Sequence, residues 1–391
     1  MGEREDPRTE DPRTIAATNG IGDDTAFGAV APPLYLSSSF AFAGFEKSRD
    51  YDYSRTANPT RDLLGDTLAK LEGGAGAVVT SSGMAAIDLV LATLNAADLV
   101  IAPHDCYGGT YRLLAARAAK GQFKLQFLDQ NDGGALAAAL DRSPALVLLE
   151  TPSNPLMRIV DIRLIAKLAK TAGAKVAVDN TFLSPALQRP ITLGADYVIH
   201  STTKYLNGHS DVVGGAVIAA DGKDAEALAS WANVTGVTGS PFDAYLTLRG
   251  VRSLFPRIER QQQTAGVIAS VLRQHKAVVE VHYPGLWSHP GYEIAKQQQS
   301  GFGAMLSFEI AGGVNGVRKF VETLSVFTLA ESLGGVESLI AHPASMTHAG
   351  MSPEARRVAG ISDSLLRLSI GLESETDLLD DIARGFDALG R

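Results

Sequence analysis

The sequence predicts an α/β protein with one large, mostly parallel sheet, a smaller α+β region after it and an extended N-terminal arm. Between residues 63 and 219, seven short apolar runs alternate with helical patterns, as in a parallel sheet with crossover helices. Beyond residue 250 the strand and helix patterns no longer alternate strictly. Before residue 63, Pro, Ser and Gly are frequent and suggest little core. We therefore expect an arm at 1–61, a large domain at 62–250 and a C-terminal domain at 251–391.

The apolar runs in the large domain are short enough to be strands, and each is separated from the next by a turn or a helical pattern. The expected strands are residues 75–80, 99–103, 124–128, 145–150, 175–179, 197–200 and 215–218. Helical patterns between them include 85–94, 111–120 and 162–172, and the last is followed by Gly173, a residue typical of a helix C-terminus.

The C-terminal region is expected to mix helices and strands without strict alternation. A polar helical pattern at 258–275 is followed by apolar alternation at 304–310, which is typical of a strand. Two further helical patterns follow, at 316–324 and 375–389. Such an order favours a small α+β domain over further crossover units.

Composition excludes several classes of protein. The 391 residues are 45% hydrophobic and 20% charged, which is typical of a globular chain and not of a disordered one. The net charge of −8 and the scattered basic residues give no nucleic-acid footprint. The best candidate for a membrane helix, residues 85–94, is short and contains Asp88, so no membrane partner is expected.

The cysteine content and the first residues bear on the expected compartment. Cys106 is the single cysteine, so an intrachain disulfide cannot form, and it is expected to be a small buried residue. Residues 1–14 are charged and have no apolar core resembling a signal peptide, and we expect them to be a frayed tail. The cytoplasm is therefore the expected location.

Polar residues follow two expected strands at the point where ligands bind in open α/β sheets. Asp179 ends one strand, and Ser201-Thr202-Thr203-Lys204 follows the next. This set suits pyridoxal phosphate, because a lysine can form a Schiff base with its aldehyde and an aspartate can keep its pyridine nitrogen protonated. Hydroxyl groups can bind its phosphate.

Other residues could complete such a site. Ser81-Ser82-Gly83-Met84 lies where a strand turns into a helix, so free backbone N–H groups there can face an anion. Tyr107 follows the strand that ends at residue 103 and could stack on the ring. Asn154, in Ser153-Asn154-Pro155, could donate to the ring hydroxyl.

Each of these residues also has an ordinary explanation. A lysine after a strand is usually a solvated surface residue, and Asp179 could be a helix cap or a turn residue. Gly83 could serve only a strand-to-helix turn, and Asn154-Pro155 is a common turn signal. Their joint occurrence in the expected order favours the cofactor site. Metal-ligand spacing and nucleotide-binding fingerprints do not occur, so no metal is expected.

A series of motifs in register resembles the Cys/Met-metabolism family of pyridoxal-phosphate enzymes over nearly the whole chain. The motifs are Tyr53-Ser54-Arg55, Asn58-Pro59-Thr60-Arg61, Leu71-Glu72-Gly73-Gly74, Ser82-Gly83-Met84, Ala102-Pro103-His104-Asp105-Cys106-Tyr107-Gly108-Gly109, Pro152-Ser153-Asn154-Pro155, Val178-Asp179-Asn180-Thr181-Phe182, Ser201-Thr202-Thr203-Lys204-Tyr205-Leu206-Asn207-Gly208-His209 and Ala330-Glu331-Ser332-Leu333-Gly334-Gly335. The resemblance implies a fold type I enzyme with pyridoxal phosphate as cofactor, in a homotetramer built from dimers with shared active sites.

The resemblance also implies roles for individual residues. Lys204 matches the Schiff-base lysine, Asp179 the pyridinium partner, and Tyr107 the stacking tyrosine that also moves protons. The implied phosphate cup is made of Gly83, Met84, Ser201 and Thr203, with Tyr53 and Arg55 reaching in from a neighbouring subunit. Arg367 matches the arginine that binds the substrate α-carboxylate, with help from Asn154 and Ser332, and Glu331 is also expected to bind substrate. Its planar guanidinium suits a carboxylate because it donates two parallel bonds.

Family membership does not fix the reaction, because one scaffold supports several activities. The chain has Glu331-Ser332-Leu333-Gly334-Gly335 where β-lyases of the family tend to have Tyr-Ser-Trp-Gly-Gly, which argues against β-lyase activity. Glu331 is shared by the γ-synthase and γ-lyase groups, so it does not separate these two activities. The segment 102–112 resembles bacterial γ-synthases, as does 338–343.

The resemblance to γ-synthases implies replacement of the succinyl group of O-succinyl-L-homoserine by L-cysteine, giving L-cystathionine and succinate in methionine biosynthesis. Arg112 is our candidate for the acyl carboxylate and Asp52 for an incoming amino group, although Arg112 could instead pair with an acidic neighbour on the surface. The alternatives are a γ-lyase that cleaves L-cystathionine to cysteine, 2-oxobutyrate and ammonia, and a binding protein that has lost catalysis.

Overall fold

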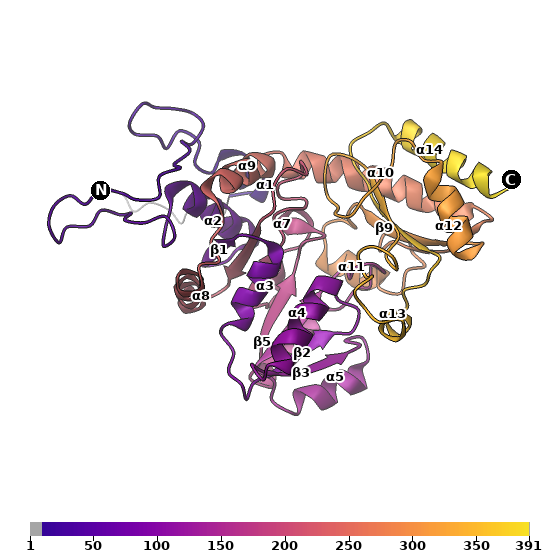
Figure 1. Ribbon diagram of the computed structural model, residues 1–391, viewed down its shortest axis with the longest axis horizontal. Coiled ribbons are helices and arrows are strands. Elements are labelled where there is room, and N and C mark those ends of the chain that lie inside the picture. The colour runs from indigo at the N-terminus through magenta and orange to yellow at the C-terminus, as the bar shows by residue number, and fades with distance from the viewer. Residues whose placement is uncertain (1–9, 391) are drawn as a thin grey trace.

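The computed structural model describes residues 10–390. Figure 1 shows a large α/β layer structure in the middle of the molecule, a second sheet with its helices at the C-terminal end, and loops of the N-terminal arm that project from the opposite end. Two sheets are present in the described part of the chain, one of seven strands and one of five. The predicted fold class is therefore confirmed.

The first sheet contains the seven expected strands. They are β1 Gly76–Thr80, β2 Leu99–Pro103, β3 Lys124–Leu128, β4 Leu146–Glu150, β5 Lys175–Asp179, β6 Tyr197–His200 and β7 Gly215–Ala219. Their spatial order is β1-β7-β6-β5-β4-β2-β3, and the run from β3 to β6 is parallel. β7 is antiparallel to both β1 and β6. The sheet is therefore mostly parallel, and its central strands are apolar because both of their faces are covered.

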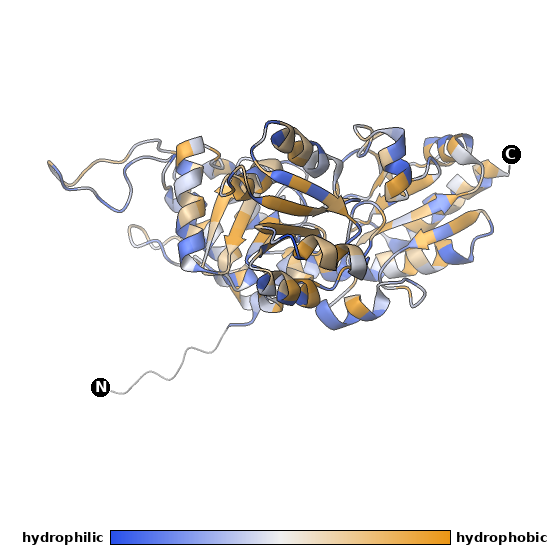
Figure 2. Cartoon of the chain, turned by 90° about the horizontal axis from the view of Figure 1, so that it is seen from below, coloured by the Kyte–Doolittle hydropathy of each residue, from blue (hydrophilic) through white to orange (hydrophobic). Residues whose placement is uncertain are grey.

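Helices cover both faces of this sheet. One face packs against α3 Gly83–Leu91, α4 Gly108–Ala119 and α8 Gly222–Thr235, and the other packs against α5 Gly133–Leu140, α6 Ile162–Thr171 and α2 Pro59–Glu72. Figure 2 shows the strands of the first sheet as predominantly hydrophobic, with hydrophilic residues on the outer sides of the helices. The sequence did not predict α2, α5 or α8, because alanine, glycine and scattered charges weaken their apolar periodicity.

The ends of α6 follow from local chemistry. Asp161 accepts a hydrogen bond from the backbone N–H of Leu164, which caps the first turn. Gly173 has φ of +79°, a left-handed conformation that glycine adopts without strain and that stops the helix. The helix therefore ends where the sequence predicted.

The second sheet contains β8 Val278–His282, β9 Met305–Ile310, β10 Thr328–Leu329, β11 Leu339–Ala341 and β12 Leu365–Ser369. Its order is β10-β11-β12-β9-β8, and all of its pairs are antiparallel except β10 with β11. The accompanying helices are α10 Leu254–Gln274, α11 Tyr292–Gln298, α12 Gly313–Glu322, α13 Pro353–Ala359 and α14 Glu375–Leu389. The expected helices at 258–275, 316–324 and 375–389 and the strand at 304–310 correspond to α10, α12, α14 and β9.

The two sheets are joined through one apolar core. The largest cluster of buried side chains includes Leu64 of α2, Val198 of β6, Ile258 of α10 and Phe308 of β9. α9, Pro241–Val251, leads from the first sheet into α10. Residues of both parts share this cluster, so β6 of the first sheet is packed in the same core as β9 of the second sheet.

The N-terminal arm contributes little to this core. Its one helix in the described residues before α2 is α1, Pro12–Thr18. Two short helices of the large domain, α7 Ser184–Leu187 and η1 Pro190–Leu193, follow β5. Phe27 and Phe45 of the arm are 95% and 91% exposed.

The expected domain division at 61/62 falls inside α2 and that at 250/251 inside α9, so we propose boundaries at 58/59 and 252/253. Residues 1–9 of the expected frayed tail lie outside the described residues.

Candidate active site

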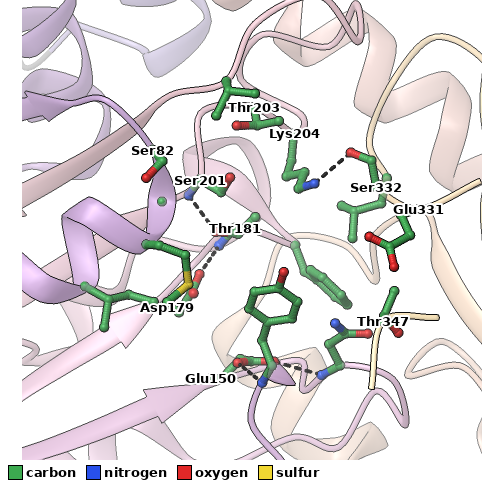
Figure 3. Close-up of a pocket in the computed structure, with 18 of the residues that line it drawn as sticks. Ser82, Glu150, Asp179, Thr181, Ser201, Thr203, Lys204, Glu331, Ser332 and Thr347 are labelled. Atoms are coloured by element: carbon green, nitrogen blue, oxygen red, sulfur yellow. Dashed lines mark hydrogen bonds between the residues drawn. The ribbon is translucent and has the colours of Figure 1, made fainter. Parts of the chain in front are cut away.

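A cavity of about 390 Å³ opens at the carboxyl ends of β1, β4, β5 and β6, beside loops of the second sheet (Figure 3). This edge of a parallel sheet is where free helix N-termini and strand-end side chains face the same space. The cavity is lined by Ser82, Gly83, Met84, Ile87, Tyr107, Glu150, Pro152, Asn154, Asp179, Thr181, Phe182, Ser201, Thr203, Lys204, Val213, Glu331, Ser332, Leu333, Thr347 and Arg367.

The N-terminus of α3 meets the end of β6 without space for a side chain between them. Gly83 is the first residue of α3, and a Cβ atom there would lie 2.7 Å from Cβ of Ser201. Ser82 caps the helix by accepting a hydrogen bond of 3.1 Å from the backbone N–H of Ala85. The first N–H groups of the helix and the hydroxyls of Ser201 and Thr203 therefore border one small concave region, which suits a phosphate group.

Lys204 lies on the turn after β6 with its amine inside the cavity. Its Nζ donates a hydrogen bond of 2.7 Å to Oγ of Ser332, which comes from the loop between β10 and β11 (Figure 3). Burial and the positive charge of Arg367 lower the pKa of Lys204 to about 8. A sizeable fraction of this amine is therefore neutral near physiological pH and can act as a nucleophile or a base.

Asp179 faces the cavity from the end of β5. Its Oδ1 accepts a hydrogen bond of 3.0 Å from the backbone N–H of Thr181, whose Oγ1 accepts from the N–H of Ser201 at 2.9 Å (Figure 3). Burial raises the pKa of Asp179, while the bonds from Thr181 and the charge of His200 lower it. A cationic N–H group placed in the cavity would stabilise the carboxylate form.

Glu150, a residue that the sequence reasoning missed, fixes two of the predicted site residues. Its Oε2 accepts from the backbone N–H of Tyr107 and its Oε1 from that of Asn154, both at 2.9 Å (Figure 3). Burial and the charge of Asp179 raise its pKa well above the usual value for glutamate. Because Glu150 ends an apolar strand as Asp179 does, its position at a strand end was the signal that could have identified it.

Arg367 is a buried cation in the wall of the cavity. It lies on β12 and is 2% exposed; its Nη1 donates to Oδ1 of Asn154 at 2.9 Å, and its Nη2 donates to the carbonyl oxygen of Ser332 at 2.8 Å. Its Nε is buried and has no hydrogen-bond partner among the described residues. Burial lowers the pKa of Arg367 to about 10. A ligand carboxylate would satisfy this donor and balance the charge.

The structure thus brings eleven predicted residues to one cavity, but four others lie outside it. Tyr53 and Arg55 are exposed on the arm, where the guanidinium donates to the carbonyl oxygen of Asn233 at 2.7 Å. Asp52 is exposed beside Tyr53, and Arg112 is exposed on α4. Ser82, part of the segment that the sequence analysis assigned to an anion, lines the cavity as well, whereas Thr181, Phe182 and Thr347 line it without having been assigned a role.

The cavity suits pyridoxal phosphate in volume and in the order of its polar groups. The concave region at Gly83 and Ser201 suits the phosphate, Lys204 the aldehyde and Asp179 the pyridine nitrogen. The close approach at Gly83, and the Nε of Arg367, which has no hydrogen-bond partner in the described part of the chain, are compatible with two anionic groups in the cavity. The fold and this site define a fold type I enzyme that depends on pyridoxal phosphate.

The chain belongs to the Cys/Met metabolism PLP-dependent enzyme family, whose model matches residues 13–387. It is 56% identical over 379 residues to a cystathionine gamma-synthase of Escherichia coli (strain K12), covering 97% of this chain and 98% of that protein. It is also 46% identical over 375 residues to a cystathionine beta-lyase of Lactococcus lactis subsp. cremoris, covering 96% and 98%.

A solved structure has the same fold over nearly the full length. The cystathionine gamma synthase of Xanthomonas oryzae pv. oryzae in complex with cystathionine is 59% identical, has a TM-score of 0.97, and is matched over 97% of this chain and 99% of that one. Relatives therefore include both synthases and a lyase.

In the described part of the chain, no helix is long and apolar enough to cross a membrane, and no three acidic, His or Cys side chains gather as metal ligands would.

Proposed function

We propose that the protein is a cystathionine γ-synthase, which replaces the succinyl group of O-succinyl-L-homoserine with L-cysteine and releases L-cystathionine and succinate. The main support is that Lys204 and Arg367 both donate hydrogen bonds to Ser332 and both line the cavity. A basic amine and a cation able to bind a carboxylate are therefore close enough to act on one amino acid. The 56% identity to a relative named for this reaction supports the choice within the family. When bound, pyridoxal phosphate withdraws electrons from the substrate Cα and makes its proton removable.

Arg367 and Asn154 would hold the substrate α-carboxylate. The guanidinium already bonds to the Asn154 amide oxygen, so both side chains are oriented before the substrate arrives. Two parallel bonds from one planar cation fix the rotation of the carboxylate and thereby the direction of the Cα–H bond. Ser332, with φ of +85°, turns its carbonyl oxygen toward Arg367 and its hydroxyl toward Lys204.

Lys204 would move the protons at Cα and Cβ. Its neutral amine would remove the Cα proton, pass that proton on toward the bound cofactor and, neutral again, remove a Cβ proton, after which the succinate oxygen separates from Cγ with its electron pair. The thiolate sulfur of cysteine then forms a bond to Cγ, and the protons return to Cβ and Cα. Tyr107 would accept the proton of the incoming thiol or amine, and Phe182 and Leu333 would help to keep water out.

The distal part of the substrate is assigned on charge alone. We keep Arg112 as the candidate for the succinyl carboxylate and Asp52 for the amino group of cysteine, although both are exposed and outside the cavity of one chain. Glu331 lines the cavity and is a further candidate for an amino group.

The competing function is γ-elimination of cystathionine, and a relative named as a gamma-lyase, which is 44% identical to this chain, keeps it in consideration. The deciding experiment is a mass-spectrometric product assay with pyridoxal phosphate on two mixtures. O-Succinylhomoserine with cysteine should give cystathionine rapidly, and cystathionine alone should decay slowly. The reverse, with cysteine, 2-oxobutyrate and ammonia from the second mixture, would make the protein a γ-lyase. A protein that binds the cofactor but forms no product from either would be a binding protein.

We further propose a cytoplasmic homotetramer built from dimers with shared active sites. The exposed aromatic side chains of the arm support a contact between subunits, because large apolar groups in water are unfavourable. In such a dimer Tyr53 and Arg55 would reach the phosphate of the neighbouring site. The single buried Cys106 suits a reducing compartment.

A further inference from the structure

Three polar residues form a buried cluster beneath the active site, on the side of the sheet away from the cavity. Glu72, the last residue of α2, and His200 and Asn180 are all fully buried. Oε1 of Glu72 accepts from Nε2 of His200 at 2.7 Å and from Nδ2 of Asn180 at 2.9 Å. None of the three lines the cavity.

The cluster is attached to the same two strand ends that carry the site. Successive residues of a strand face opposite sides of the sheet. Asp179 faces the cavity and the next residue, Asn180, bonds to Glu72 behind it; likewise His200 bonds to Glu72 and the next residue, Ser201, faces the cavity. Glu72 therefore links the ends of β5 and β6 from behind.

A matching link joins the two strand ends on the cavity side. Ser201 donates to Thr181, and Thr181 donates to Asp179. Asn180 is held further by its Nδ2, which donates to the carbonyl oxygen of Gln188 at 2.8 Å, and by its Oδ1, which accepts from Nε2 of Gln188 at 3.0 Å. The position of Asp179 is thus fixed from both sides.

The cluster is a poor choice for stability alone. A carboxylate at the C-terminal end of a helix is opposed by the helix dipole, and its burial costs solvation. Oε2 of Glu72 and Nδ1 of His200 are buried and have no hydrogen-bond partner among the described residues. An apolar cluster of the same size would avoid these costs.

We propose that Glu72, through His200 and Asn180, is a positioning residue that holds Asp179 in place and in its charged form for the pyridine nitrogen of the cofactor. The inference rests on the proposed role of Asp179. It is supported by the charges around that carboxyl: burial raises its pKa and His200 lowers it, while Glu150, an acid on the neighbouring strand, is coupled to it by charge repulsion. Without the bonds from Glu72 to His200 and Asn180, the strand ends that carry Asp179 and Ser201 would lose their link behind the sheet.

The test is a double-mutant cycle on cofactor affinity. We expect Glu72→Gln to weaken the binding of pyridoxal phosphate to the apoprotein by about tenfold or more, the equivalent of a one-unit change in the pKa of one group. In the Asp179→Asn background the same change should cost less than about threefold, because the residue it acts through is gone. Affinity is measured by fluorescence titration of the full-length protein, independently of turnover.

The matched control is Asp381→Asn, which alters another fully buried carboxylate that does not line the cavity. Asp381, on α14, accepts from the backbone N–H groups of Ser325, Val326 and Phe327. This variant should melt at a lower temperature and keep the parent affinity for the cofactor. If Glu72→Gln does not fold, His200→Gln, which replaces the ring with a side chain of different length that can still donate toward Glu72, takes its place in the cycle.

Each outcome is decisive. An equal loss of affinity in both backgrounds, or no loss in either, would mean that the cluster is only structural. If Asp179→Asn alone binds the cofactor as tightly as the parent, the assignment of Asp179 is wrong and the inference falls with it. That result would be distinguishable from a failure of Glu72 to act on a correctly assigned Asp179.

Discussion

The surroundings of Lys204 lower its pKa, because burial and the charge of Arg367 favour the neutral form of its amine. The neutral amine is the nucleophile that attaches the cofactor, and its fraction rises with pH until the pH exceeds the pKa. We therefore predict that the rate of cofactor attachment to the apoprotein rises with pH and levels off above about 8. The rate is followed by borohydride reduction and mass spectrometry of the peptide that contains Lys204.

The free amino acid Nα-acetyllysine is the control for this measurement. Its attachment rate should continue to rise up to about pH 10, the ordinary range for lysine. A rate at Lys204 that follows the same profile would contradict the lowered pKa. Lys204→Ala should attach no cofactor at this peptide and should lose turnover.

Arg367 should tolerate even a conservative change poorly. Lysine keeps the charge but cannot donate simultaneously to Asn154, Ser332 and a ligand carboxylate from one plane. We predict that Arg367→Lys lowers kcat/KM for the amino-acid substrate by about a hundredfold, mainly through KM, since two charge-assisted bonds are lost or distorted. Steady-state kinetics with varied substrate concentration measure both constants.

Arg357→Lys is the matched control on the surface. Arg357 lies on α13 and pairs with Glu354, and both side chains are exposed. Because exposed ion pairs contribute little, this change should leave kcat, KM and the melting temperature unchanged. An equal effect of both substitutions would argue against a substrate role for Arg367.

At the scale of elements, two glycines at the same helix position offer a comparison. Gly83 begins α3 and Gly133 begins α5, but a Cβ at Gly83 would lie 2.7 Å from Cβ of Ser201, whereas one at Gly133 would have no neighbour within 4 Å. We predict that Gly83→Ala weakens cofactor binding by at least about tenfold, because α3 must move from β6 to relieve the overlap.

Gly133→Ala should instead leave cofactor affinity unchanged and slightly raise the melting temperature, since alanine restricts the unfolded chain more than glycine does. Cofactor titration and thermal unfolding on both variants check this pair of predictions. Equal cofactor affinities for the two variants would mean that the junction of α3 and β6 does not form the phosphate site.

At the scale of the whole molecule, the arm and the cavity are separate in one chain. Arg55 is bonded to Asn233 and lies outside the cavity, while Lys204 is inside. If active sites are shared, a subunit with Arg55→Ala and one with Lys204→Ala can together form one site with both residues intact. We predict that hybrids of these inactive or weakened variants recover activity, measured after mixing under conditions that exchange subunits.

Separately tagged subunits verify that the hybrids have formed, and the unmixed variants are the control. Verified hybrids without recovery would contradict shared sites. Sedimentation analysis of the parent protein tests the proposed tetramer independently.

The sequence allowed much of the site to be predicted because its residues stand at strand ends. Lys204, Asp179 and Asn154 each follow an apolar run, and the order of the runs placed them at one edge of the sheet. Glu150 also ends an apolar strand, so the same signal was present but was not used. Glu72 ends a helix with weak periodicity, and its partner His200 lies far away in the sequence, so no local signal marked it.

By itself, the sequence determined the alternating strands and helices, the caps that end them, and the residues able to bind a phosphate, an aldehyde and a carboxylate. These are local properties, set by periodicity, side-chain chemistry and backbone preference. Tertiary structure alone decided that Ser332 bonds to Lys204, that Arg367 is buried beside Asn154, and that Glu72 bonds to His200 and Asn180. Those contacts join residues more than a hundred positions apart, and burial then shifts their charges, which only the packed chain can do.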